Sequence, residues 1–264
     1  MNIFYNGEAK QINVLDERFY ESQVNKGIFY PGVTTILEAY YKGYGFNEWL
    51  KQVGFNADEI LRKAGEQGTN VHNMIDLYLS GFKINWVNDN GGSNYTLEEW
   101  QMFCKFIEFF EREKPEILVK EFNVVSENLK YGGTIDLVCK LKGKIWLIDY
   151  KTSNYIHKTH ELQISAYSTA WNELNPKYKI DKTGILWLRS LTRGEDKKGE
   201  KIQGEGWQLK EFDRSYEEAF KLFIHTQAIW NEEHPNYKPK NLTYSSEFEL
   251  SKEITKPETK ETLF

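Results

Sequence analysis

Two apolar runs joined by a tight turn constrain this chain more than any other feature. Residues 134–141 and 145–150 are rich in Ile, Leu, Val and Trp, and Lys142-Gly143-Lys144 separates them. Glycines bound the runs, so the pattern predicts two β-strands joined in a hairpin. Residues 145–148 are continuously apolar rather than alternating, which is typical of a strand covered on both faces. We therefore expect a sheet with further layers on both sides.

Charged side chains enter abruptly where the second run ends. Asp149 and Lys151 lie on one face of that strand and Tyr150 on the other, because side chains alternate along a strand. The hairpin also brings Asp136 near Asp149. Two carboxylates beside an apolar sheet repel each other, and burial raises that cost. A divalent cation between them removes it, so the pattern predicts a Mg²⁺-type site. A solvated strand face is the simpler alternative.

Four ordered motifs resemble the PD-(D/E)XK nuclease superfamily, in the branch that contains the RecB nuclease domain. That branch has a helical histidine, a G-x-x-D strand, a D-x-K motif, and Q-x-x-x-Y on a helix. The matching positions are His72, residues 133–136, residues 149–151, and Gln163 with Tyr167. The upstream segments DERFY, YPGVTTIL and EQGTNVHNMIDLYLSG look like those of phage exonucleases and the mitochondrial genome maintenance exonuclease. The resemblance covers roughly residues 16–167.

The resemblance implies hydrolysis of phosphodiester bonds assisted by one or two Mg²⁺ or Mn²⁺ ions. It implies His72, Asp136, Asp149 and the Tyr150 carbonyl as metal ligands. Lys151 would position the attacking water and stabilise the charged transition state. The catalytic residues implied are Asp136, Asp149, Lys151 and Glu121, and the residues implied to hold substrate are Gln163, Tyr167, Thr152 and Ser153.

Three candidate residues have a plain structural alternative. A lone helical histidine usually packs or faces solvent, so a metal-binding role for His72 depends on the resemblance. Asp76, one turn after His72, could orient the imidazole, but a solvated helix acid is the simpler interpretation. Glu121 could line the site or face solvent on its strand.

Length and element order predict an α/β fold. The 264 residues suit a single nuclease domain over residues 1–233, mainly helical at 36–113 and with a catalytic sheet core at 116–212. Strand patterns between helical ones favour a central mixed sheet flanked by helices, as in a restriction-endonuclease-like core. The helical part upstream of the sheet would roof the site. Residues 234–264 are polar and contain prolines, so we expect a mobile tail.

Composition excludes several classes of protein. No apolar stretch approaches the roughly 20 residues that span a bilayer, and the first ten residues do not resemble a signal peptide. We expect a cytoplasmic protein, in the host cytoplasm if phage-encoded, without a membrane partner. Cys104 and Cys139 are the only cysteines. They suit a reducing compartment and cannot supply the four thiolates of an iron–sulphur cluster, so we expect none.

Charge is distributed unevenly along the chain. A net charge of −5 is not typical of a general nucleic-acid binder. Residues 140–160 nevertheless contain five lysines and one acidic residue, Asp149. The lysines could form a basic rim around an acidic metal centre or belong to solvated turns.

The position of His72 predicts the substrate. For His72 to reach the metal, helical residues 47–80 must fold over the catalytic strands. A roofed cleft with aromatic residues suits an unpaired strand, whose bases stack on rings. The candidate rings are Tyr40, Tyr41, Tyr44 and Trp49. We therefore expect a metal-dependent exonuclease acting on single-stranded DNA with a free end. Alternatives are a structure- or sequence-specific endonuclease on the same fold, or a non-catalytic nucleic-acid-binding module.

Overall fold

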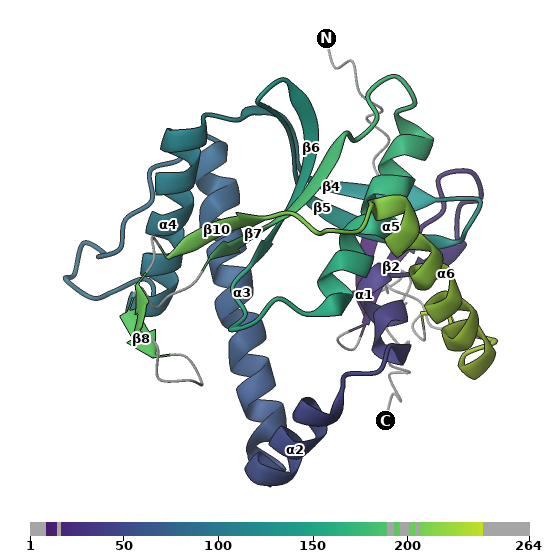
Figure 1. Ribbon diagram of the computed structural model, residues 1–264, viewed down its shortest axis with the longest axis horizontal. Coiled ribbons are helices and arrows are strands. Elements are labelled where there is room, and N and C mark those ends of the chain that lie inside the picture. The colour runs from purple at the N-terminus through teal and green to yellow at the C-terminus, as the bar shows by residue number, and fades with distance from the viewer. Residues whose placement is uncertain (1–8, 15–16, 189–192, 196–200, 204–205, 240–264) are drawn as a thin grey trace, which may run out of the picture.

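A five-stranded mixed sheet forms the centre of the protein (Figure 1). The computed structural model describes residues 9–14, 17–188, 193–195, 201–203 and 206–239. The strand order is β10-β7-β6-β5-β4, with β6 parallel to β7 and the other neighbours antiparallel. The strands are β4 (Glu116–Ser126), β5 (Tyr131–Leu141), β6 (Lys144–Lys151), β7 (Lys182–Leu188) and β10 (Trp207–Lys210). Helices flank the sheet, so the predicted fold class is confirmed.

The predicted hairpin is β5–β6. Lys142 and Gly143 make its turn with φ angles of 51° and 75°, values that favour glycine at the second position. Leu137 pairs with Ile148, so the register brings Asp136 to the end of β6 that carries Asp149. The predicted convergence of two carboxylates follows from this register.

Helices α3 (Ala57–Leu79) and α4 (Leu97–Glu113) cover one face of the sheet (Figure 1). A capping box starts α4: Glu99 N donates to Thr96 Oγ1, and Thr96 N donates to the Glu99 carboxylate. The buried apolar residues between these helices and the sheet include Val71, Met74, Phe103, Phe106, Leu137, Ile148 and Leu186. This layer fixes the position of α3, the helix that carries His72.

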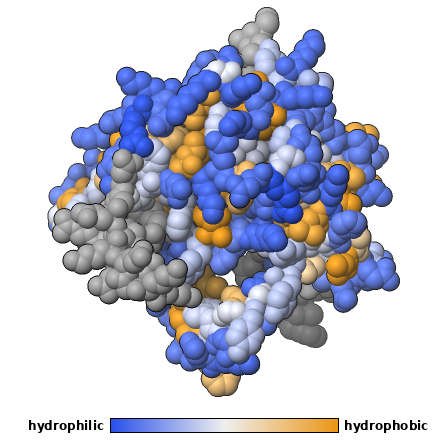
Figure 2. Space-filling model, viewed as in Figure 1, coloured by the Kyte–Doolittle hydropathy of each residue, from blue (hydrophilic) through white to orange (hydrophobic). Residues whose placement is uncertain are grey.

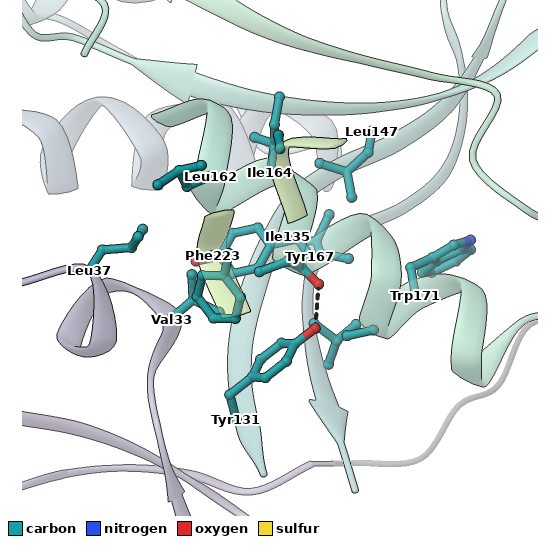
Figure 3. Close-up of a cluster of buried hydrophobic side chains, with 14 of the residues drawn as sticks. Val33, Leu37, Tyr131, Ile135, Leu147, Leu162, Ile164, Tyr167, Trp171 and Phe223 are labelled. Carbon is teal, nitrogen blue, oxygen red and sulfur yellow. Dashed lines mark hydrogen bonds between the residues drawn. The ribbon is translucent and has the colours of Figure 1, made fainter. Parts of the chain in front are cut away.

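The opposite face packs on α1 (Val33–Ile36), α5 (Lys158–Leu174) and α6 (Tyr216–Glu233). Figure 3 shows this core, where Tyr131, Trp171 and Phe223 lie among aliphatic side chains. The Tyr131 hydroxyl donates to the carbonyl of Ala166 in α5 over 2.9 Å. Because α5 connects the parallel strands β6 and β7, its start lies beside the end of β6.

Smaller elements complete the structure. The sheet of β1, β2 and β3 packs on β5, where a Cβ on Gly132 would lie 2.5 Å from Tyr20. Helix α2 buries no residue, and with the start of α3 it forms an arm extending from the body (Figure 1). These elements are β1 (Gln11–Val14), β2 (Glu17–Glu21), β3 (Phe29–Pro31), η1 (Leu37–Ala39), α2 (Tyr44–Val53), η2 (Gly54–Asn56), β8 (Arg193–Glu195) and β9 (Lys201–Gln203).

The chain stays packed for a few residues after α6. Tyr237 stacks on Phe19 with ring centroids 5.0 Å apart and meets Trp230 edge-on at 4.7 Å. The rest of the predicted tail, residues 240–264, lies outside the described residues. In the described part of the chain, every helix is too short or too polar to cross a bilayer.

Candidate metal centre and substrate cleft

The side chain of His72, on α3, contacts the β5–β6 hairpin. Its Nδ1 lies 3.4 Å from Asp136 Oδ1, and its Nε2 lies 3.2 Å from the carbonyl oxygen of Tyr150. Burial lowers the pKa of His72, but the Asp136 carboxylate and its hydrogen bond outweigh this, so the pKa is raised above its ordinary value. The structure therefore brings three of the predicted metal-binding groups together.

Asp136 is fixed by the backbone of the neighbouring strand. Tyr150 N donates to Asp136 Oδ2 over 2.6 Å, and the side chain is buried. Burial alone would raise the pKa of Asp136, but His72 and Lys151 together hold it below its ordinary value. Asp136 is therefore ionised and oriented before any ligand binds.

Asp149 and Lys151 form an ion pair at the end of β6. Lys151 Nζ lies 2.6 Å from Asp149 Oδ2, and Asp149 is 1% exposed. Burial raises the pKa of Asp149 to about 6; Lys151 opposes the rise and Asp136 adds to it. Asp149 Oδ2 is buried, and the Lys151 ammonium group is the charge that lies against it.

Glu121 joins the centre from β4. Its φ is +43°, a left-handed conformation that is uncommon for a non-glycine residue, just past a register irregularity between Ile117 and Val119. Ligand atoms of Glu121, His72 and Asp136 lie within 4.8 Å of one another. Glu121 exposes part of its side chain, yet protein packed around its carboxyl group and the charge of Asp136 raise its pKa to about 7.

These groups fit a hard divalent cation. Carboxylate and carbonyl oxygens with one imidazole suit Mg²⁺ or Mn²⁺. Within the described residues, His72, Glu121 and Asp136 are the one group of three metal-binding side chains this close together. The sequence predicted Glu121 as a catalytic acid and Asp149 as a ligand. The structure brings Glu121 into the ligand cluster, and Asp149 lies outside it.

A cleft of about 930 Å³ opens over this centre. Figure 2 shows the surface hollowed between the α2–α3 arm, at the bottom of the view, and the body. Tyr40 and Tyr41 line the cleft as predicted, but Tyr44 and Trp49 do not. Tyr44 is 72% exposed, and Trp49 packs beside Phe46, which does line the cleft. The basic or imidazole side chains on the walls are Arg18, Lys42, Lys151, Lys158, His72, His157 and His160.

The predicted substrate-holding residues also line the cleft, but at different depths. Gln163 and Tyr167 are 8% and 4% exposed, and Gln163 Nε2 donates to the Tyr167 hydroxyl over 3.0 Å. Ser153 Oγ donates to the Tyr155 carbonyl over 2.8 Å, which stabilises the turn after β6. A Cβ on Gly68 of α3 would lie 3.2 Å from Thr152 Oγ1, so that turn approaches the arm closely.

The role suggested for Asp76 is wrong. Asp76 pairs with Lys120 of β4, and the carboxylate beside His72 is that of Asp136. Asp76 follows His72 by four residues on α3, but its carboxylate pairs with Lys120. The hairpin register brings Asp136 to the end of β6, where it meets the imidazole.

The suggested basic rim is also wrong for most of its lysines. Lys140 and Lys142 pair with Glu116 and Glu113 near the hairpin turn. That turn lies at the opposite end of β6 from Lys151, about 20 Å away at 3.3 Å per residue. Of the five lysines between residues 140 and 160, two line the cleft, Lys151 and Lys158.

A protein-family model described as the PD-(D/E)XK nuclease superfamily matches residues 48–239. This range contains every residue predicted to act in catalysis or to bind metal, and the chain belongs to that superfamily. Its members are phosphodiester hydrolases that use divalent metal ions, so the substrate is a nucleic acid. No curated protein matches the sequence.

A crystal structure from Eubacterium rectale, of a protein named "Putative exonuclease", is similar to this fold. The sequence identity is 12%, the match covers 71% of this chain and 77% of that chain, and the TM-score is 0.39. At this level the similarity bears on neither activity nor substrate.

Proposed function

We propose that this protein is a Mg²⁺- or Mn²⁺-dependent deoxyribonuclease of the RecB-like branch that degrades single-stranded DNA from a free end. The observation that carries the proposal is the contact of His72 with Asp136 and the Tyr150 carbonyl. One helix thereby completes the metal centre and forms a wall of the cleft. The order of the four motifs supports the branch and the relation to phage and mitochondrial exonucleases.

The residues of the proposed centre have different roles. His72, Glu121, Asp136, Asp149 and the Tyr150 carbonyl would hold the metal, which when bound would lower the pKa of a water and neutralise charge on the leaving oxygen. Asp149 holds Lys151 in place through their 2.6 Å ion pair. The Lys151 ammonium then orients the attacking water and stabilises negative charge on the phosphate.

The cleft suits an unpaired strand. Tyr40, Tyr41 and Phe46 offer rings on which bases can stack, while Arg18 and Lys42 can contact the backbone. The arm joins the body at both ends, through the buried residues Leu37 before α2 and Val71 in α3. A strand that passes between the arm and the body would therefore enter by one of its ends. Gln163, Tyr167, Thr152 and Ser153 would form the floor of this path.

The wider setting is part of the same proposal. Residues 1–233 would act as one nuclease domain, with the helical residues 36–113 roofing the sheet core at 116–212. The cytoplasm, or the cytoplasm of a host, is the compartment that two unpaired cysteines suit best.

An assay on end-labelled DNA tests this function. Wild-type protein with Mg²⁺ or Mn²⁺ should shorten a single strand progressively and leave a blunt duplex largely intact. EDTA should abolish the activity. Internal cuts in either substrate would instead identify an endonuclease. DNA binding without hydrolysis, in protein that binds Mn²⁺, would identify a non-catalytic module.

A further inference from the structure

One face of α5 lines the cleft. His160, Gln163 and Tyr167 follow the spacing i, i+3, i+7, which places them on one side of the helix, and all three line the cleft. Tyr167 and Gln163 are buried and bonded to each other. His160, one turn nearer the helix start, stays partly exposed. Among these three residues, His160 is the one whose side chain a strand in the cleft can readily touch.

The imidazole of His160 is held in one tautomer. The backbone N–H of His157 donates to His160 Nδ1 over 3.3 Å, and the carbonyl of His157 accepts from His160 N over 3.1 Å. Because Nδ1 accepts a hydrogen bond, the ring proton lies on Nε2. Within the described part of the chain, Nε2 has no protein acceptor. The donor N–H is therefore oriented and available.

The surroundings of His160 keep it neutral. Burial, followed by the charges of Lys151 and His157, lowers the pKa of His160 to about 3. A neutral donor next to Lys151 adds a hydrogen bond without the repulsion that a second cation would bring. A phosphate offers several acceptor oxygens and can take hydrogen bonds from both side chains at once.

We propose that His160 is a DNA-binding residue, a neutral Nε2–H donor that contacts a backbone phosphate beside Lys151. This inference rests on the proposed function and assigns a contact on the same strand. The residue acts on binding, since the hydrolytic machinery lies in His72, Asp136, Asp149 and Lys151. The contact with His160 also places the phosphate next to the ammonium group of Lys151.

Fluorescence anisotropy of a labelled oligothymidylate in EDTA measures this contact without hydrolysis. His160→Phe keeps a flat ring and removes the donor, so it should weaken binding roughly tenfold, the effect of one hydrogen bond to a charged group. His160→Gln keeps an N–H donor and should retain most of the affinity. His225→Phe changes an exposed histidine of α6 that does not line the cleft and is the matched control, expected near wild type. Thermal unfolding confirms that each variant is folded.

Nitrogen-15 NMR of the histidine rings gives a second readout that needs no DNA. His160 should show a neutral ring with the proton on Nε2 at pH 6. A protonated ring at that pH would overturn the assignment. So would wild-type affinity in a folded His160→Phe variant, or equal loss in His160→Phe and His160→Gln. If wild-type protein did not bind oligothymidylate, the proposed function would fail as well. If wild-type protein binds it and the His160 variants behave as just described, only the role of His160 is contradicted.

Discussion

The ring of Tyr167 lies directly on Gly133. A Cβ added at Gly133 would come within 2.1 Å of Tyr167 Cε1, closer than any real contact allows. Gly133 belongs to the G-x-x-D strand and Tyr167 to the Q-x-x-x-Y helix, so this contact joins two of the four motifs. The strand needs glycine here because a helix side chain packs against its backbone. The contact sets how far α5 stands from Asp136.

Gly133→Ala should therefore destabilise the fold by about 1–3 kcal/mol, the usual cost of overpacking a core. Urea unfolding measures it. Gly45→Ala in α2 is the matched control, because an added Cβ there meets no atom within 4 Å. Replacing Tyr167 with Leu should relieve part of the loss in the double variant. Gly133→Ala with wild-type stability would show that the ring moves aside freely.

Lys151→Ala should cut turnover by roughly a hundredfold or more, because it removes one group that stabilises transition-state charge. Mn²⁺ affinity should stay near wild type. Lys151→Arg should not restore the rate, since the planar guanidinium cannot reproduce the position of the ammonium. Initial rates on labelled single strands, with calorimetric Mn²⁺ titration alongside, measure both effects. Near-normal turnover in Lys151→Ala would remove this residue from the chemistry.

Metal affinity should follow the geometry of the centre. Asp136→Asn and Glu121→Gln should each weaken Mn²⁺ binding strongly, because an amide lacks the charge that holds a hard cation. Asp149→Asn should weaken it less, because Asp149 lies outside the close cluster. Isothermal titration of each metal-free variant with Mn²⁺ ranks the three by metal affinity. Unchanged affinity in both Asp136→Asn and Glu121→Gln would rule out a shared site.

His72→Ala should shift metal preference from Mn²⁺ toward Mg²⁺, because imidazole favours the softer ion. The ratio of initial rates in the two metals measures the shift. A variant with the wild-type ratio and rate would make His72 a packing residue.

The stability of the metal-free protein should fall as pH rises from 5 to 8. The pKa of Glu121 is raised to about 7 and that of Asp149 to about 6. A carboxyl group with a raised folded-state pKa contributes stability at low pH, and this is lost as pH rises through that pKa. His72 acts in the same direction, since its pKa is raised as well. His160, whose pKa is lowered from 6.5 to about 3, opposes the fall below pH 6.5, and the two carboxyl groups together with His72 outweigh it.

Glu121→Gln should flatten this dependence near pH 7, and thermal unfolding across the range measures it. Glu116→Gln is the control, an exposed glutamate on the same strand. Saturating Mn²⁺ should remove the slope, because metal competes with protons for the same carboxylates. An identical pH profile in Glu121→Gln and wild type would contradict the assignment.

The hairpin and the fold class could be predicted because local sequence determines them. Apolar runs around Lys142-Gly143-Lys144 define strand positions, and alternation then decides that Asp149 and Lys151 share a face. The register of Leu137 with Ile148 follows from the short turn. These features depend on residues that are close together in the sequence, so they can be predicted from it.

Other parts of the site depend on contacts that no local pattern records. Glu121 reaches the centre through a left-handed backbone in β4, where the sequence shows an ordinary strand. The rotation of α2 turns Tyr44 to solvent and Phe46 to the cleft. His160 stands one turn before Gln163 on the same face, and the helical period from the Q-x-x-x-Y motif was the signal that could have found it.

The central claim is that a strand enters the cleft by its end. Linear and circular single-stranded DNA of the same sequence, incubated with Mg²⁺ and resolved on a denaturing gel, test it most directly. The account predicts that the linear strand is degraded and the circle stays intact, while the circle becomes a substrate once it is cut at one site. Equal degradation of both forms would contradict it.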